Sequence, residues 1–90
     1  MSINENADSS VRDDMESFFS DTCDHKDYYT HLYEGSDDMP SHIKSTIIGS
    51  SITVPITNGR FNLGIWQGIY LNEHRDYGSE RNIVITVIGE

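Results

Sequence analysis

The sequence has 90 residues and one cysteine, Cys23, so it can fill one hydrophobic core and excludes an internal disulfide. Its formal net charge of −9 repels phosphate backbones and argues against nucleic acid as a partner. No apolar run approaches the roughly 20 residues that span a bilayer, and the N-terminus lacks the pattern of a signal peptide. We therefore expect a cytoplasmic protein with neither a membrane nor a nucleic-acid partner.

The first half of the sequence predicts two helices. Four apolar residues recur at helical spacing over about residues 9–21, and Ser10 with Asp13 resembles a capping box. After a loop, a second helix is expected to begin near Pro40, because the missing N–H of proline costs nothing in a first turn. Gly49 is a natural stop for this helix. The apolar residues of the first helix are Val11, Met15, Phe18 and Phe19.

Beyond residue 50 the period of the apolar residues changes to two, which predicts strands. The first strand, from Ser51, is expected to enter a hairpin through a type I′ turn at Asn58-Gly59. Further strands are expected over about 65–73 and 82–88. The last has apolar residues on both faces, so we expect it to be central and covered on both sides. Helices followed by a sheet indicate an α+β fold.

Residue chemistry alone leaves the site open. Neutral imidazole is a common metal ligand, but the four histidines match no known zinc spacing, and the pattern of each one taken alone favours a capping or surface role over that of a ligand. Glu73 closes an apolar strand beside Arg75, where a carboxylate can be a base, a metal ligand or the partner of an arginine. The histidines are His25, His31, His42 and His74.

Four segments in a fixed order carry a family resemblance. They are SINENADSSVRDD (Ser2–Asp14), YTHLYEGSDDMPSHIKSTIIGSS (Tyr29–Ser51), ITVPITNGRFNLGIWQGIYLNEHRD (Ile52–Asp76), and NIVITVIG (Asn82–Gly89) after Arg81. Together they cover essentially the whole chain. They resemble the YjbQ-like family, also called secondary thiamine-phosphate synthase, in its eukaryote-like form. One departure is Ile65, where the family usually has threonine.

The resemblance implies a single α+β domain over residues 1–90. Its mostly antiparallel sheet would close into a partly open barrel or sandwich with two helices. The resemblance also implies a homotrimer, and association would supply stability that so small a domain lacks. Family members have two further strands and a histidine segment before the first motif, so we expect this chain to be N-terminally truncated relative to the family.

The resemblance further implies a cleft near the subunit interface. The catalytic positions that it transfers to this chain are His31, His42 and Glu73. The two histidines are also the expected ligands of a divalent metal, either Zn²⁺ or Mg²⁺. The positions expected to bind a phosphorylated small molecule are Asn4, Glu5, Asp13, Arg75 and Arg81.

Three functions remain open at this level. The first is a transferase of the thiamine-phosphate-synthase type, which condenses a pyrimidine diphosphate with a thiazole phosphate and releases pyrophosphate. The second is a homotrimer that binds a metal or a small ligand without catalysis. The third is a degenerate fragment with no activity of its own.

Overall fold

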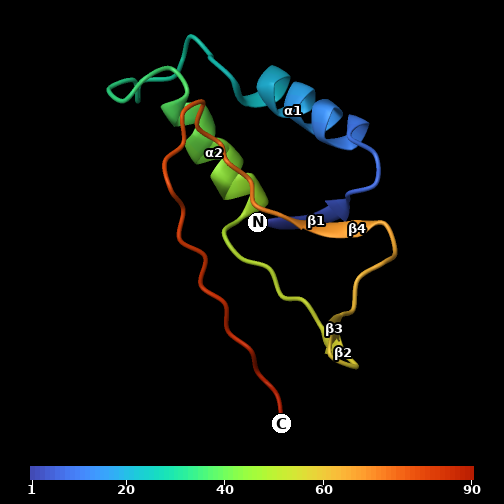
Figure 1. Cartoon of the computed structure of the whole chain (residues 1–90). Coiled ribbons are helices and arrows are strands. Elements are labelled where there is room, and N and C mark those ends of the chain that lie inside the picture. Colours follow the sequence, from blue (N-terminus) through green and yellow to red (C-terminus); the bar gives the residue numbers. More distant parts are fainter.

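The computed structural model describes residues 1–90 and contains two helices and two separate two-stranded antiparallel sheets (Figure 1). The predicted α+β class is confirmed. The predicted closure of the sheet into a barrel is not found, because β1 pairs only with β4 and β2 pairs only with β3. In chain order the elements are β1 (Ser2–Glu5), α1 (Ser10–Cys23), α2 (Asp38–Ile48), β2 (Ile56–Thr57), β3 (Arg60–Phe61) and β4 (Gln67–Tyr70).

Helix α1 forms where the apolar spacing predicts it, but its N-terminus is not held by the expected capping box. Ser9 is the N-cap residue, and its side chain makes no capping hydrogen bond. Asp8 replaces the predicted Ser10–Asp13 pair, because its Oδ1 accepts a hydrogen bond from the Ser10 N–H at 2.9 Å. An aspartate bonds readily to the backbone two residues ahead of it, and this local contact prevails here.

Helix α2 begins two residues before the expected start at Pro40. Pro40 therefore lies in the first turn, where its missing N–H leaves no bond unmade. The helix ends before Gly49, as predicted, and the Gly49 N–H donates to the Ser45 carbonyl at 2.8 Å. Gly49 has φ 83° and ψ 172°, a backbone conformation almost restricted to glycine.

The two sheets join different parts of the chain. β1 lies beside β4, with Ser2 opposite Tyr70 and Glu5 opposite Gln67, so the first residues are held against a segment far along the sequence (Figure 1). The predicted hairpin is confirmed as β2 and β3. Asn58 and Gly59 have φ 53° and 75°, the positive values that a type I′ turn requires.

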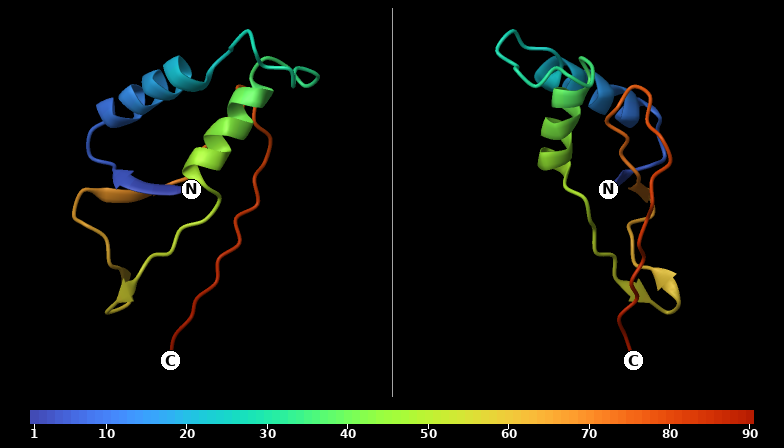
Figure 2. Two further views of the ribbon diagram at one scale, coloured as in Figure 1. Left: turned by 180° about the vertical axis from the view of Figure 1, so that it is seen from behind. Right: turned by 90° about the vertical axis from the view of Figure 1, so that its left-hand side faces the viewer.

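The prediction for the last strand is wrong. Residues 82–88 are extended but pair with no other segment, and they run away from the rest of the molecule to the C-terminus (Figure 2). Val84 and Ile88 on one face are 90% and 94% exposed, and Ile85 and Val87 on the other are 82% and 73% exposed, so neither face is covered. The apolar pattern correctly marks a segment suited to burial, but no strand of this chain lies beside it.

The chain is extended for its size. The radius of gyration is 15.8 Å, against about 12 Å for a compact domain of this length. The accessible surface of 7489 Å² exceeds the roughly 5,300 Å² expected of a folded monomer of this mass. Four residues are buried, and most of the large apolar side chains remain open to solvent. Neither helix has the length and apolar character to cross a membrane.

Candidate functional site

The first turn of α2 brings together two of the predicted histidines and an aspartate. Asp38 opens the helix and His42 follows one turn later, so both side chains lie on one face. The His42 Nε2 is 3.4 Å from Asp38 Oδ2, and the Nε2 of His31, from the preceding loop, is 3.0 Å from the same oxygen. The two imidazole rings meet edge to face, with centroids 5.2 Å apart. We call these three residues the His–Asp–His group.

Asp38 Oδ2 is a buried oxygen without a hydrogen bond. Both imidazole nitrogens are close to it, yet neither makes a hydrogen bond to it. The Asp38 side chain is 5% exposed, whereas His31 and His42 are 51% and 59% exposed. A buried carboxylate oxygen without a hydrogen bond carries a substantial desolvation cost, which a cation bound at this position would offset.

The donor set suits Zn²⁺. Two imidazole nitrogens and one carboxylate oxygen are common zinc ligands, whereas Mg²⁺ prefers oxygen ligands alone. Zinc bonds of about 2.0–2.1 Å in tetrahedral geometry place neighbouring ligand atoms about 3.3 Å apart. The two measured nitrogen–oxygen separations are 3.0 and 3.4 Å, and all three donor atoms lie within 4.8 Å of one another. The group could therefore hold zinc and leave a fourth position free.

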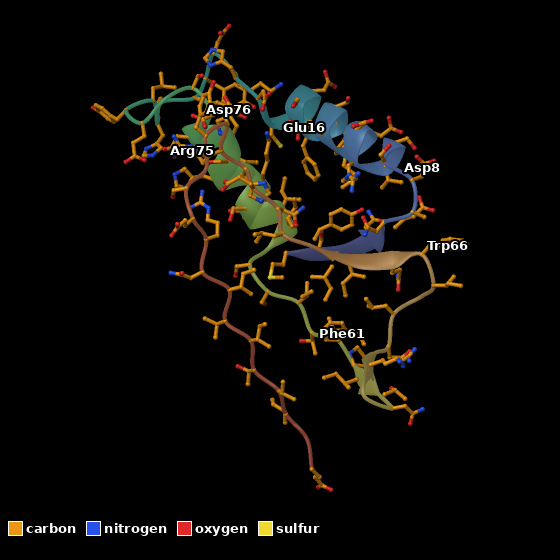
Figure 3. All side chains as sticks on the ribbon, in the orientation of Figure 1. Asp8, Glu16, Phe61, Trp66, Arg75 and Asp76 are labelled. Carbon is orange, nitrogen blue, oxygen red and sulfur yellow. The ribbon has the colours of Figure 1, made fainter.

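Arg75 holds the N-terminus of α2 from the segment that follows β4 (Figure 3). Its Nη1 is 3.1 Å from Asp38 Oδ1, and its Nε is 2.9 Å from Asp37 Oδ2. Its Nη2 donates to the Glu34 carbonyl at 2.8 Å. The Asp76 N–H donates to Asp37 Oδ2 at 2.9 Å, so two consecutive residues bind this end of the helix. The hydrogen bond from Arg75 lowers the pKa of Asp37 to about 2.

Glu73 pairs with Arg81. The Arg81 Nε and Nη2 donate to Oε1 and Oε2 of Glu73 at 2.8 and 2.9 Å, and the Arg75 N–H donates to Oε2 at 3.1 Å. These bonds, chiefly those from Arg81, lower the pKa of Glu73 to about 2. Of the three roles considered for Glu73, the geometry matches the partner of an arginine. A carboxylate with so low a pKa is a weak base near neutral pH.

A polar hollow of about 360 Å³ connects these groups, and its lining contains no apolar residue. The pKa of His74, in its wall, is lowered, chiefly by burial, so this imidazole is neutral at pH 7. The structure therefore places His42, Glu73, Arg75 and Arg81 around one hollow, while His31 contacts Asp38. The remaining lining residues are Asp38, Ser41, Ser45, Asn72 and His74.

The other predicted ligand-binding residues lie elsewhere. Asn4 lines a larger hollow of about 460 Å³, between α1, α2 and the β1–β4 sheet, which shares residues 72–75 with the polar hollow. Glu5 lies in β1, paired with Gln67, and Asp13 is exposed on α1. Their expected role in ligand binding stays a prediction.

Sequence reasoning did not select Asp37 and Asp38. The signal for Asp38 was present, since it precedes His42 by four residues, the spacing that places two side chains on one helix face. Fifteen acidic residues in 90 made any single aspartate weak evidence. The role of Asp37 depends on Arg75, which is 38 residues further along the chain.

Fold and site together define a small α+β protein whose helix N-terminus carries a histidine–aspartate–histidine group. The model of the family described as UPF0047 protein YjbQ-like matches residues 1–90, and the chain belongs to this family. The predicted family resemblance is thereby confirmed.

Two curated relatives illustrate the similarity. The chain is 51% identical over 90 residues to the UPF0047 protein YjbQ of Escherichia coli O157:H7, covering 100% of this chain and 65% of that protein. It is 44% identical over 89 residues to a UPF0047 protein of Synechocystis, covering 98% of this chain and 60% of that protein. The chain thus spans somewhat less than two-thirds of the length of these relatives. No solved structure matches it significantly.

The Arg75–Asp37 contact predicts a loss of stability in acid. The pKa of Asp37 is about 2 in the folded chain, below its ordinary value of 3.8. Its contribution is therefore complete above about pH 4 and is lost as the pH falls toward 2. We expect Asp37→Asn to lower the free energy of unfolding at pH 7 and to flatten its dependence between pH 5 and 2.

Urea unfolding at a series of pH values measures this effect. Asp13→Asn is the control, because Asp13 is exposed on α1 and makes no ion pair. If the free energy of unfolding of Asp37→Asn has the same pH dependence as that of Asp13→Asn and of the parent chain, the Arg75–Asp37 contact does not cause the loss of stability in acid.

Proposed function

We propose that the chain holds a divalent metal ion, Zn²⁺, on the His–Asp–His group and binds a phosphorylated small molecule in the polar hollow beside it. The observation that carries this proposal is the buried Asp38 Oδ2, which has no hydrogen bond and lies between two imidazole nitrogens. A bound zinc ion would act as a Lewis acid toward a phosphoryl oxygen or activate a water molecule.

The positive charge of Arg81 in the hollow supports the proposal of an anionic ligand. The Glu73–Arg81 pair is partly open to solvent, with side chains 36% and 44% exposed. Exposed ion pairs contribute little to stability, so an incoming phosphate can replace the Glu73 carboxylate on Arg81 at small cost. A guanidinium binds phosphate through two parallel hydrogen bonds. Ser45 adds a hydroxyl donor to the same hollow, whereas the Ser41 hydroxyl already donates to the Asp38 carbonyl at 2.6 Å.

For the reaction, we propose condensation of a pyrimidine diphosphate with a thiazole phosphate and release of pyrophosphate. The support is the family resemblance together with the arginine beside the metal group. In this reaction Arg81 binds the diphosphate and neutralises the charge that develops on the leaving pyrophosphate. Arg75 holds the Asp38 side of the hollow in place, and Glu73 is the counter-ion that Arg81 leaves when the substrate binds.

We also propose that the chain acts as a homotrimer. The support is the surface that a single chain leaves uncovered, above all the apolar residues of the 82–88 segment. Burial of such surface between subunits supplies the stability that four buried residues in one chain cannot. A trimer that binds metal without catalysing the condensation is the alternative function, and the assay below separates the two.

The metal site predicts tight, stoichiometric Zn²⁺ binding. We expect elemental analysis after dialysis to find one zinc ion per chain. Competition with a chelating dye then measures Kd. His42→Ala and Asp38→Asn each remove a ligand, so we expect Kd to rise on the order of 100-fold or more, beyond the effect of an outer-shell change. His25→Ala is the control, because His25 lies beside Asp27 and outside the group. Absence of binding by the parent chain would sink the proposal.

The reaction predicts that pyrophosphate release depends on Arg81. Loss of charge-assisted hydrogen bonds worth about 1.5 kcal/mol should make Arg81→Gln raise KM for the pyrimidine diphosphate about tenfold. His42→Ala should abolish release. Arg60→Gln, in the β2–β3 hairpin and remote from the hollow, is the matched control. A zinc-binding chain that releases no pyrophosphate would instead support the non-catalytic alternative.

The trimer predicts a molar mass of three chains by size-exclusion chromatography with light scattering. Val84→Lys places a charge on the exposed apolar segment, and we expect it to shift the mass to that of one chain. Tyr33→Lys, equally exposed in the loop before α2, should leave the mass unchanged. A parent chain that is monomeric at every concentration would contradict the proposal.

A further inference from the structure

We propose that Arg75 is the positioning residue of the metal group: it turns the Asp38 carboxylate so that Oδ2 faces His31 and His42. This inference rests on the proposed function, because it concerns the same metal site. It adds a role that the two histidines and the aspartate do not reveal by themselves, and it separates Arg75 from the ligand-binding role that the sequence suggested.

The two carboxylate oxygens of Asp38 have different surroundings. Arg75 Nη1 is 3.1 Å from Oδ1, whereas Oδ2 has no hydrogen bond and has the two imidazole nitrogens at 3.0 and 3.4 Å. A free carboxylate turns about its last torsion, which is broad. The contact with Arg75 selects one orientation and leaves the second oxygen for the metal. The low exposure of Asp38, 5%, keeps water from taking the place of the arginine.

Arg75 is itself held in place by other residues. The Asp37 carboxylate accepts hydrogen bonds from Arg75 Nε at 2.9 Å and from Arg75 Nη2 at 3.3 Å. The Glu34 carbonyl accepts a further hydrogen bond from Nη2 at 2.8 Å. All three nitrogens of the guanidinium are therefore engaged. Such a planar fork cannot follow Asp38 if the carboxylate rotates. This differs from an exposed surface pair, in which both side chains keep their freedom.

Asp37 compensates the positive charge of Arg75. A bare guanidinium beside a metal ligand would repel a divalent cation. Asp37 carries the compensating negative charge at two short distances, so Arg75 and Asp37 together are neutral. Asp38 then keeps its full negative charge for the metal. This pairing explains why two consecutive aspartates stand at the start of α2, where the helix dipole also favours negative charge.

Arginine is needed for this role. Lysine offers a single point charge and cannot hold Asp37 through two nitrogens and Asp38 through a third. We therefore expect Arg75→Lys to keep the charge, and much of the fold, without restoring the orientation of Asp38.

The test uses the full 90-residue chain with Zn²⁺ and Co²⁺ as probes. Arg75→Lys and Arg75→Gln should raise Kd for both ions 10- to 100-fold, the usual effect of losing an outer-shell partner. They should also change the intensity of the visible Co²⁺ absorption, which reports coordination geometry and does not respond to stability alone. Far-UV circular dichroism shows which variants fold. Asp37→Asn, which weakens only the hold on Arg75, should give a smaller rise in Kd.

Arg60→Gln is the matched control, because Arg60 lies in the β2–β3 hairpin, outside the polar hollow, and its Kd should equal that of the parent. If Arg75→Gln does not fold, Arg75→Lys and Asp37→Asn decide the question. Folded variants that bind both ions as tightly as the parent, with an unchanged Co²⁺ spectrum, overturn the inference and leave the metal site standing. A parent chain that binds neither ion overturns the proposed function itself.

Discussion

The contact between Arg75 and the two aspartates at the start of α2, Asp37 and Asp38, is the interaction on which the candidate site depends. It joins the segment after β4 to the second helix and, through Asp38, to His31 and His42. Buried ionic groups are costly unless every member finds a partner. Here Asp38 Oδ2 is a buried oxygen without a hydrogen bond, and it lies where three donor atoms of zinc-binding type converge.

The two arginines near the His–Asp–His group, Arg75 and Arg81, have different surroundings. Arg75 is held in place by several partners, whereas Arg81 has only one. Arg75 is engaged through all three guanidinium nitrogens. Arg81 makes one partly exposed pair with Glu73 and remains available to an anionic ligand. Both arginines line the same polar hollow beside the His–Asp–His group. Arg75 is a fixed part of the framework there, and Arg81 is the guanidinium proposed to exchange Glu73 for a ligand. With a net charge of −9 and six basic residues, the chain concentrates two of those six at this place.

The rest of the chain buries little of its apolar surface. Its surface exceeds that of a compact monomer, and its last segment, suited to burial on both faces, has no neighbour. Membership of the UPF0047 YjbQ-like family accounts for the order of the motifs. Folding within a single chain leaves the apolar pattern of this segment unsatisfied, and the homotrimer proposed above would bury it.

The sequence by itself determined the elements whose causes are local. The apolar spacing predicted α1, Pro40 and Gly49 predicted the start and end of α2, and Asn58-Gly59 predicted the hairpin, because each depends on residues close together in the sequence. The motifs also identified the family and directed attention to His31 and His42. Only the tertiary structure decided that Asp38 joins these histidines, that Arg75 holds it from 37 residues away, and that Glu73 pairs with Arg81. It also decided that residues 82–88 remain unpaired, since apolar residues on both faces of a segment favour burial beside other strands but do not supply those strands.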